Sequence, residues 1–160
     1  MQKENKYYTL SEALLKAANY CAYQERSHNE VLAKLGELGV YGIDADELLL
    51  KLIAQNYLNE ERFAQTYAGS KFRVKKWGRL KIKRELQLKG VSAPCIQIAM
   101  KEIDPDNYFQ TLQKLVEAKF QTSKLNNPLE IGRKTYQYLA TKGYESDLIW
   151  DAIRLYQAQE

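Results

Sequence analysis

Apolar side chains recur every three or four residues through most of this 160-residue chain, as an amphipathic helix requires. The segment from Thr9 to Glu12 has the pattern of a capping box, and apolar positions at helical spacing follow it. Ser27 or Asn29 can cap the next helix, and Gly39 can end it in the left-handed conformation that glycine tolerates. The pattern therefore predicts consecutive helices from the first dozen residues onward.

The rest of the chain continues in the same way. Acidic residues at Asp44 to Glu47 are typical of a first helical turn, where they complement the helix dipole. Proline is scarce and falls where helices would begin, and no hairpin turn signal separates alternating runs. We therefore expect an all-α protein, with later helices starting at Asn59, at Ser92, at Asp106 or Asn107, at Pro128 and at Ser146.

One segment is ambiguous by periodicity alone, because its apolar residues fall on even positions and also fit a strand: Leu80, Ile82, Leu86 and Leu88. An internal repeat decides between the two interpretations. Three predicted helix ends place a leucine four residues before a glycine, and those glycines, at 39, 90 and 143, are 51 and 53 residues apart. This period favours three tandem three-helix repeats, at about 10–57, 58–104 and 106–158, each packed on its neighbours.

Composition places the chain among proteins that do not enter membranes. Hydrophobic residues make up 45% of it, the mean hydropathy is −0.54, and no apolar run approaches the roughly 20 residues of a membrane span. The segment 1–13 has no apolar stretch typical of a signal peptide. Cys21 and Cys95 lie far apart at apolar helix positions, so we expect buried, reduced thiols. These observations predict a cytoplasmic protein.

Positive charge is concentrated in one stretch, residues 71–90. Nine cations and one acid give it a local charge of +8, whereas the whole chain carries +4, so the remainder sums to −4. Repeated cations with aromatic and apolar residues between them suit a polyanion or an acidic protein surface. A solvated helix face is the other interpretation of such a run. The predicted site comprises Lys71, Arg73, Lys75, Lys76, Arg79, Lys81, Lys83, Arg84 and Lys89.

Within this stretch, Arg79, Lys83 and Arg84 are expected to be exposed on one helix. Trp77 can stack on a base or pack between repeats as core. Glu85 is expected to pair with Lys81 or Lys89, one turn away. Of the twelve tyrosines, six near apolar stripes are expected at the edge of the core (Tyr23, Tyr57, Tyr67, Tyr138, Tyr144 and Tyr156), and three are expected to be freer (Tyr7, Tyr8 and Tyr41).

Catalytic motifs are missing from the sequence. The single histidine, His28, cannot form an HExxH motif, and it sits at a predicted helix start. The clustered acids lie in first helical turns, and no glycine-rich phosphate loop with a GK[ST] ending is present. We therefore expect no enzyme activity, no metal and no cofactor.

The central repeat resembles the RecX family of regulatory proteins. Leu58 to Ala64 is similar to the family's Leu-Asp-Asp-x-Arg-Phe-Ala helix start, although Asn59-Glu60 replaces the acidic pair. Gly78 to Val91 is similar to its Gly-x-x-x-Ile-x-x-Glu-Leu-x-x-Lys-Gly-Val segment. Arg26 to Leu35 is similar to its Arg-Ser-x-x-Glu-Leu-x-x-Lys-Leu element, with Val31 in place of leucine. The third repeat follows the family only in helix order.

The resemblance implies a non-enzymatic modulator of the RecA recombinase. It also implies an all-α fold in which three helix-turn-helix-like repeats form an elongated, curved stack. Such proteins bind RecA filaments on single-stranded DNA and inhibit ATP hydrolysis and strand exchange. We expect RecA and single- and double-stranded DNA as partners of a monomer, with the basic face of the second repeat engaging filament acids or DNA phosphates. Two alternatives are a general nucleic-acid-binding helical module, with DNA as its direct target, and a helical protein adaptor unrelated to DNA.

Overall fold

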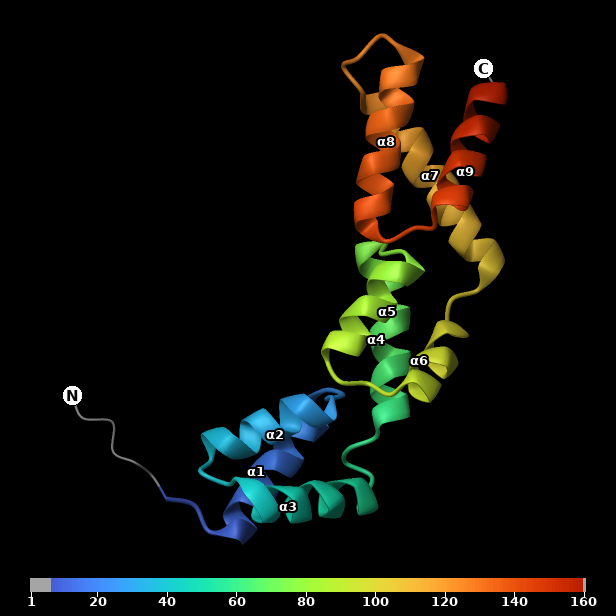
Figure 1. The fold of residues 1–160 in the computed structure, drawn as a ribbon. Helices are drawn as coiled ribbons and strands as arrows, with labels where there is room; N and C mark the ends of the chain where they lie inside the picture. The colour runs from blue at the N-terminus through green and yellow to red at the C-terminus, as the bar shows by residue number, and fades with distance from the viewer. Residues whose placement is uncertain (1–6, 160) are drawn as a thin grey trace, which may run out of the picture.

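The computed structural model describes residues 7–159, and all regular secondary structure within them is α-helical. The helices follow one another from one end of an elongated molecule to the other, with the first three turned away from the long axis (Figure 1). Their bounds are α1 Leu10–Tyr23, α2 His28–Glu37, α3 Gly42–Ala54, α4 Glu60–Lys75, α5 Arg79–Leu88, α6 Ala93–Met100, α7 Pro105–Thr122, α8 Pro128–Lys142 and α9 Ser146–Ala158.

These helices form three three-helix units, which confirms the predicted fold class: α1–α3, α4–α6 and α7–α9. We call them the first, second and third unit. The residue limits 10–57, 58–104 and 106–158 stay a prediction. Within residues 7–159 no helix is long and apolar enough to cross a membrane.

Side-chain caps begin most of the helices where the sequence indicates. The side chains of Thr9, Ser27 and Asn59 each accept a hydrogen bond from the backbone N–H three residues later. The predicted cap of α7 at Asp106 or Asn107 is wrong. Asp104 caps it instead, because Pro105 occupies the first turn, where its missing N–H costs nothing.

The first unit has a core of its own. It is built mainly of small and aliphatic residues, with Leu35, Leu52 and Leu58 among its largest buried side chains. Cys21 is buried in it as a free thiol, while Cys95, in the second unit, is half-buried. The buried side of α3 carries Ala45, Leu48 and Leu52, and Ile53 lies off that side, with 39% of its surface exposed.

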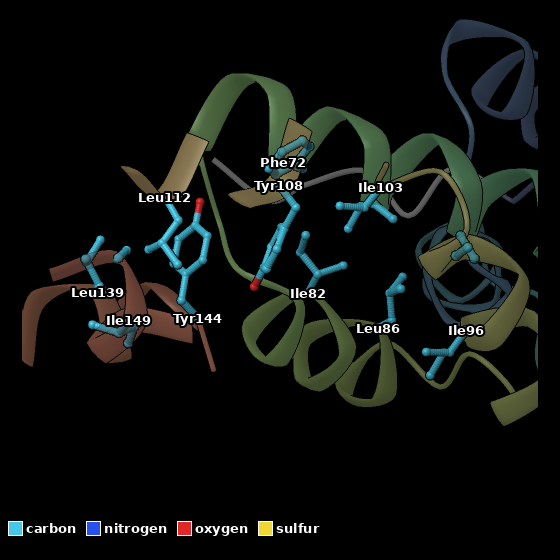
Figure 2. Packing of buried hydrophobic residues seen from close by; sticks show 14 of the residues in the cluster. Phe72, Ile82, Leu86, Ile96, Ile103, Tyr108, Leu112, Leu139, Tyr144 and Ile149 are labelled. Atoms are coloured by element: carbon cyan, nitrogen blue, oxygen red, sulfur yellow. The ribbon is translucent and has the colours of Figure 1, made fainter. Parts of the chain in front are cut away.

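The second and third units share a single continuous core. Figure 2 shows Tyr108, from α7, lying beside Phe72 and Ile82 of the second unit, with Tyr144, Leu139 and Ile149 of the third unit beyond it. Ring centroids of Tyr108 lie 5.8 Å from Phe72 and 5.1 Å from Tyr144. A core that crosses from one unit to the next fixes their relative position by buried apolar contact.

Tyrosines occupy both extremes of exposure. Tyr108 and Tyr144 are fully buried. Tyr23 is 84% exposed, so the prediction that it lies at the edge of the core is wrong. Tyr67 and Tyr156 do pack against the core edge. Tyr7 and Tyr41 are exposed, in agreement with the sequence analysis.

Candidate basic binding surface

The ambiguous segment forms α5, an amphipathic helix. Ile82 and Leu86, one turn apart, are buried, and Leu80 and Leu88 face solvent. A strand would place all four residues on one side, but the helix buries only two of them against α4 and α6. Its cations therefore project in several directions, and each must be placed separately.

Arg79 is not an exposed cation, contrary to expectation. Its Nη1 lies 2.8 Å from a carboxylate oxygen of Glu145, and its guanidinium stacks over the ring of Tyr108, 3.9 Å from the centroid. The side chain is half-buried between the second and third units. Arg79 thus supports the joint between units and is not free to contact a partner.

Three lysines are also engaged within the molecule. Lys89 reaches Glu30 of the first unit, with Nζ 3.4 Å from Oε1. Lys71 and Lys81 lie over Trp77, their Nζ atoms 5.0 and 4.3 Å from the ring centroid. The predicted pairing of Glu85 is therefore wrong within the described residues, since both of its candidate cations have other contacts.

Trp77 packs inside the second unit. Its ring meets that of Tyr67 edge-on at 6.4 Å and lies against the shared core. Burial of Tyr67, with the carboxylates of Glu85 and Glu30 nearby, raises the pKa of its hydroxyl to about 12. The aromatic pair and the two lysines beside it form a closed cluster, so base stacking on Trp77 would require their displacement.

The remaining cations of the stretch face solvent: Arg73, Lys75, Lys76, Lys83 and Arg84. None of these five forms an ion pair within residues 7–159, although Lys76 donates to the carbonyl of Arg73 at 2.7 Å. On α5, Leu80 and Leu88, 50% and 73% exposed, stand one turn before and one turn after Arg84. The free face of α5 is therefore both basic and apolar.

The turn between α4 and α5 docks on the turn between α8 and α9. The N–H of Gly78 donates to the carbonyl of Lys142 at 2.8 Å, and the N–H of Leu80 donates to that of Gly143 at 2.9 Å. The hydroxyl of Tyr144 donates to the carbonyl of Lys76 at 2.8 Å. Gly78 packs directly on the backbone of Gly143, with no room for a β-carbon at either glycine.

This docking brings third-unit cations to the basic stretch. The Nζ of Lys142 donates to the carbonyl of Lys75 at 2.8 Å, at the C-terminal end of α4. Burial, together with the nearby ammonium groups of Lys119 and Lys76, lowers the pKa of Lys142. Lys119 lies over the ring of Tyr138, 3.8 Å from its centroid. Sequence reasoning missed Lys119 and Lys142, although Lys142 precedes its repeat glycine as Lys89 precedes Gly90.

No group of three or more His, Cys, Asp or Glu side chains among residues 7–159 is placed to hold a metal ion. His28 is the first residue of α2, where the helix begins after the Ser27 cap. Of the acids predicted for first helical turns, Asp44 in α3 and Glu60 and Glu61 in α4 occupy them. Asp46 and Glu47 lie beyond the first turn, because α3 begins at Gly42.

Comparison with known proteins agrees with this architecture. The family model for the RecX second three-helix domain matches residues 59–100, and that for the third matches residues 106–153. The chain is 32% identical over 139 residues to the regulatory protein RecX of Lactobacillus johnsonii and 30% identical over 138 residues to that of Lactobacillus gasseri. Each alignment covers 86% of this chain and 51% of the relative, so the chain spans about half the length of these relatives.

The fold of the chain also matches that of a solved structure. The crystal structure of RecX from Lactobacillus salivarius has a TM-score of 0.82 and 26% identity, covering 91% of this chain and 94% of that chain. The all-helical fold, the two matched domains and these relatives together establish that the chain belongs to the RecX family of regulatory proteins.

Proposed function

We propose that this protein binds the RecA recombinase filament on single-stranded DNA and inhibits its ATPase and strand-exchange activities, without catalysis of its own. The observation that carries the proposal is the free face of α5 in a chain of the RecX family: Lys83 and Arg84 are exposed and unpaired within the described residues, beside the exposed Leu80 and Leu88.

The chemistry of this face fits an acidic protein surface better than a phosphate backbone alone. Exposed leucines gain by burial against apolar side chains of a partner, and cations beside them select acidic neighbours. A phosphate backbone offers little apolar surface to Leu88. The α5 face is therefore assigned to the filament protein.

In this proposal, inhibition results from a difference in the protein's affinity for two states of the filament. A ligand shifts a conformational equilibrium only as far as it prefers one state over another, so binding must favour a filament state with low ATPase activity. The shared core of the second and third units holds them as one rigid surface, and in this proposal that surface bridges neighbouring filament subunits.

The test is the single-stranded-DNA-dependent ATPase rate of the cognate RecA, with this protein added in substoichiometric amounts. Wild-type protein should inhibit strongly, and Lys83→Glu/Arg84→Glu should inhibit at least about tenfold more weakly, as expected for loss of two interface charges. Arg79 is left unchanged, because reversing its charge would break the contact with Glu145.

A matched control is Lys101→Glu/Lys124→Glu, which changes the net charge equally at two exposed positions outside the basic stretch. This variant should inhibit like wild type. Absence of inhibition by wild-type protein, together with tight and salt-sensitive binding to bare DNA, would instead favour the general nucleic-acid-binding module. Full inhibition by Lys83→Glu/Arg84→Glu would remove the α5 face from the proposal.

A further inference from the structure

Four lysines from three helices gather where the second and third units meet. Lys75 and Lys76 end α4, Lys142 ends α8, and Lys119 lies near the end of α7. Lys142 is bonded to the carbonyl of Lys75, and Lys119 and Lys76 both lie near enough to act on its charge. We call these four residues the junction lysines.

No acid within residues 7–159 forms an ion pair with any of the junction lysines. Their internal contacts are backbone carbonyls of α4 and the ring of Tyr138, which neutralise no charge. Ammonium groups gathered without a counter-charge repel one another, and this repulsion contributes to the lowered pKa of Lys142. An anion placed among them would relieve it.

Tyr138 adds an aromatic surface to the lysines. The residue is 36% exposed, and the Nζ atoms of Lys119 and Lys142 lie 3.8 and 5.7 Å from its ring centroid. Cations beside a half-exposed ring are a recurrent feature of surfaces that follow a nucleic-acid strand, where phosphates meet the cations and bases meet the ring.

We propose that the junction lysines and Tyr138 form a binding site for the phosphate backbone of single-stranded nucleic acid. The inference rests on the proposed function, which places the protein on a filament that holds single-stranded DNA. Lys75 and Lys76 come from the basic stretch, and Lys119, Lys142 and Tyr138 come from the third unit. Nucleic acid and filament protein then contact different faces, the junction and the free face of α5.

The experiment measures binding of the whole chain to a fluorescein-labelled oligothymidylate by anisotropy across a salt series. Lys119→Gln/Lys142→Gln should weaken binding roughly tenfold and reduce the slope of log K against log salt by roughly 1.4, about 0.7 for each phosphate that is no longer neutralised. Lys119→Gln alone should give about half the change in slope, and its ammonium supports no backbone carbonyl, so the fold is not at risk.

The matched control is Lys114→Gln/Arg133→Gln, which removes two charges from the same helices, α7 and α8. Both side chains line grooves against α9, and no residue of α4 lines either groove. This control should keep the wild-type affinity and slope within about twofold. Equal losses in the two double variants would reduce the effect to net charge and overturn the site.

Two further measurements separate the possible ligands. Polyglutamate of similar charge should bind at least tenfold more weakly than the oligothymidylate, and equal binding would overturn the assignment to nucleic acid in favour of an acidic protein. NMR titration of the Lys142 side chain should show its pKa rising when oligothymidylate is bound, and an unchanged titration would place the nucleic acid elsewhere.

The experiments distinguish failure of the junction site from failure of the proposed function. Wild-type inhibition of RecA with no effect of Lys119→Gln/Lys142→Gln on oligothymidylate binding would overturn only the junction site. Loss of oligothymidylate binding in that variant, with no inhibition of RecA by wild-type protein, would support the junction site and reject the proposed function.

Discussion

Tyr108, near the start of α7, donates its hydroxyl hydrogen bond to the carboxylate of Glu145, the residue that precedes α9. The same hydroxyl accepts the backbone N–H of Arg79 at 3.1 Å, and the guanidinium of Arg79 pairs with the other carboxylate oxygen of Glu145. One buried phenol thus connects α7 and the residue that precedes α9 to the start of α5. The start of α5, within the basic stretch, is therefore held in place by Tyr108 and Glu145, which lie outside that stretch.

Tyr108→Phe should lower the free energy of unfolding by about 1–3 kcal/mol, because it leaves the N–H of Arg79 and a half-buried carboxylate oxygen without their partner. Denaturant unfolding measures this change. Tyr41→Phe is the control, because that ring is exposed, and it should shift stability by less than about 0.5 kcal/mol. Equal effects of the two substitutions would show that the hydroxyl of Tyr108 contributes nothing to the joint.

Stability should fall in alkali. Burial raises the pKa of Tyr108 and Tyr144 well above their usual range, and raises that of Tyr67 to about 12. Above pH 10 the unfolded chain releases these protons while the folded chain retains them, so the unfolding free energy decreases as pH rises, by at most about 1.4 kcal/mol per pH unit for each tyrosine. Melting curves and tyrosinate absorbance between pH 9 and about 12 test this expectation. Ionisation of all twelve tyrosines in one step near pH 10, without unfolding, would contradict it.

Two glycines with similar backbone angles should respond differently to substitution. Gly39 and Gly143 both have positive φ, at +81° and +98°, but a β-carbon at Gly39 meets open space while one at Gly143 overlaps Lys81. Gly39→Ala should lower the free energy of unfolding by about 1 kcal/mol, because alanine is strained in the left-handed conformation. Gly143→Ala should lower the free energy of unfolding by at least about twice as much, because the backbone and β-carbon of Lys81 cannot move aside. Thermal unfolding of both variants gives the comparison, and equal losses would argue against the close packing of the two turns.

Much of the helical order follows from local chemistry that the sequence displays. The caps at Thr9, Ser27 and Asn59, the prolines in first turns and the left-handed Gly39, Gly90 and Gly143 depend on neighbours within a few residues. Gly90→Val should be destabilising, because Gly90 has a φ of +79° and a β-carbon there would meet the side chain of Asn29. Local signals of this kind were sufficient to predict the repeats.

The ion pairs of Arg79 and Lys89 could not be predicted, because the acid that pairs with each lies in another unit. Arg79 and Glu145 are 66 residues apart, and Lys89 and Glu30 are 59 residues apart. Lys119 and Lys142 reach the basic stretch only through the docking of two turns. Charge density along the chain therefore identified a basic stretch but did not separate the cations that hold the units together from those without an ion pair in residues 7–159.

The first unit is joined to the second differently from the way the second is joined to the third. Its core is separate, and the ion pairs Arg62–Glu25 and Lys89–Glu30 connect it to the second unit. One oxygen of Glu25 is buried without a hydrogen-bond partner in residues 7–159, so the link includes a desolvation cost. A small core joined largely by polar contacts is expected to open before the larger shared core does.

This asymmetry predicts two separable unfolding transitions. Both tryptophans, Trp77 and Trp150, lie in the second and third units, so their fluorescence does not report on the first unit, whereas far-ultraviolet circular dichroism reports on every helix. In a urea titration the helical signal should therefore begin to fall before the fluorescence changes. Arg62→Ala should advance the early transition, because Glu25 loses its ion-pair partner, and Tyr108→Phe should advance the fluorescence transition. Superimposable curves from the two probes in wild-type protein would mean that the polar link couples the first unit to the rest as strongly as a shared core would.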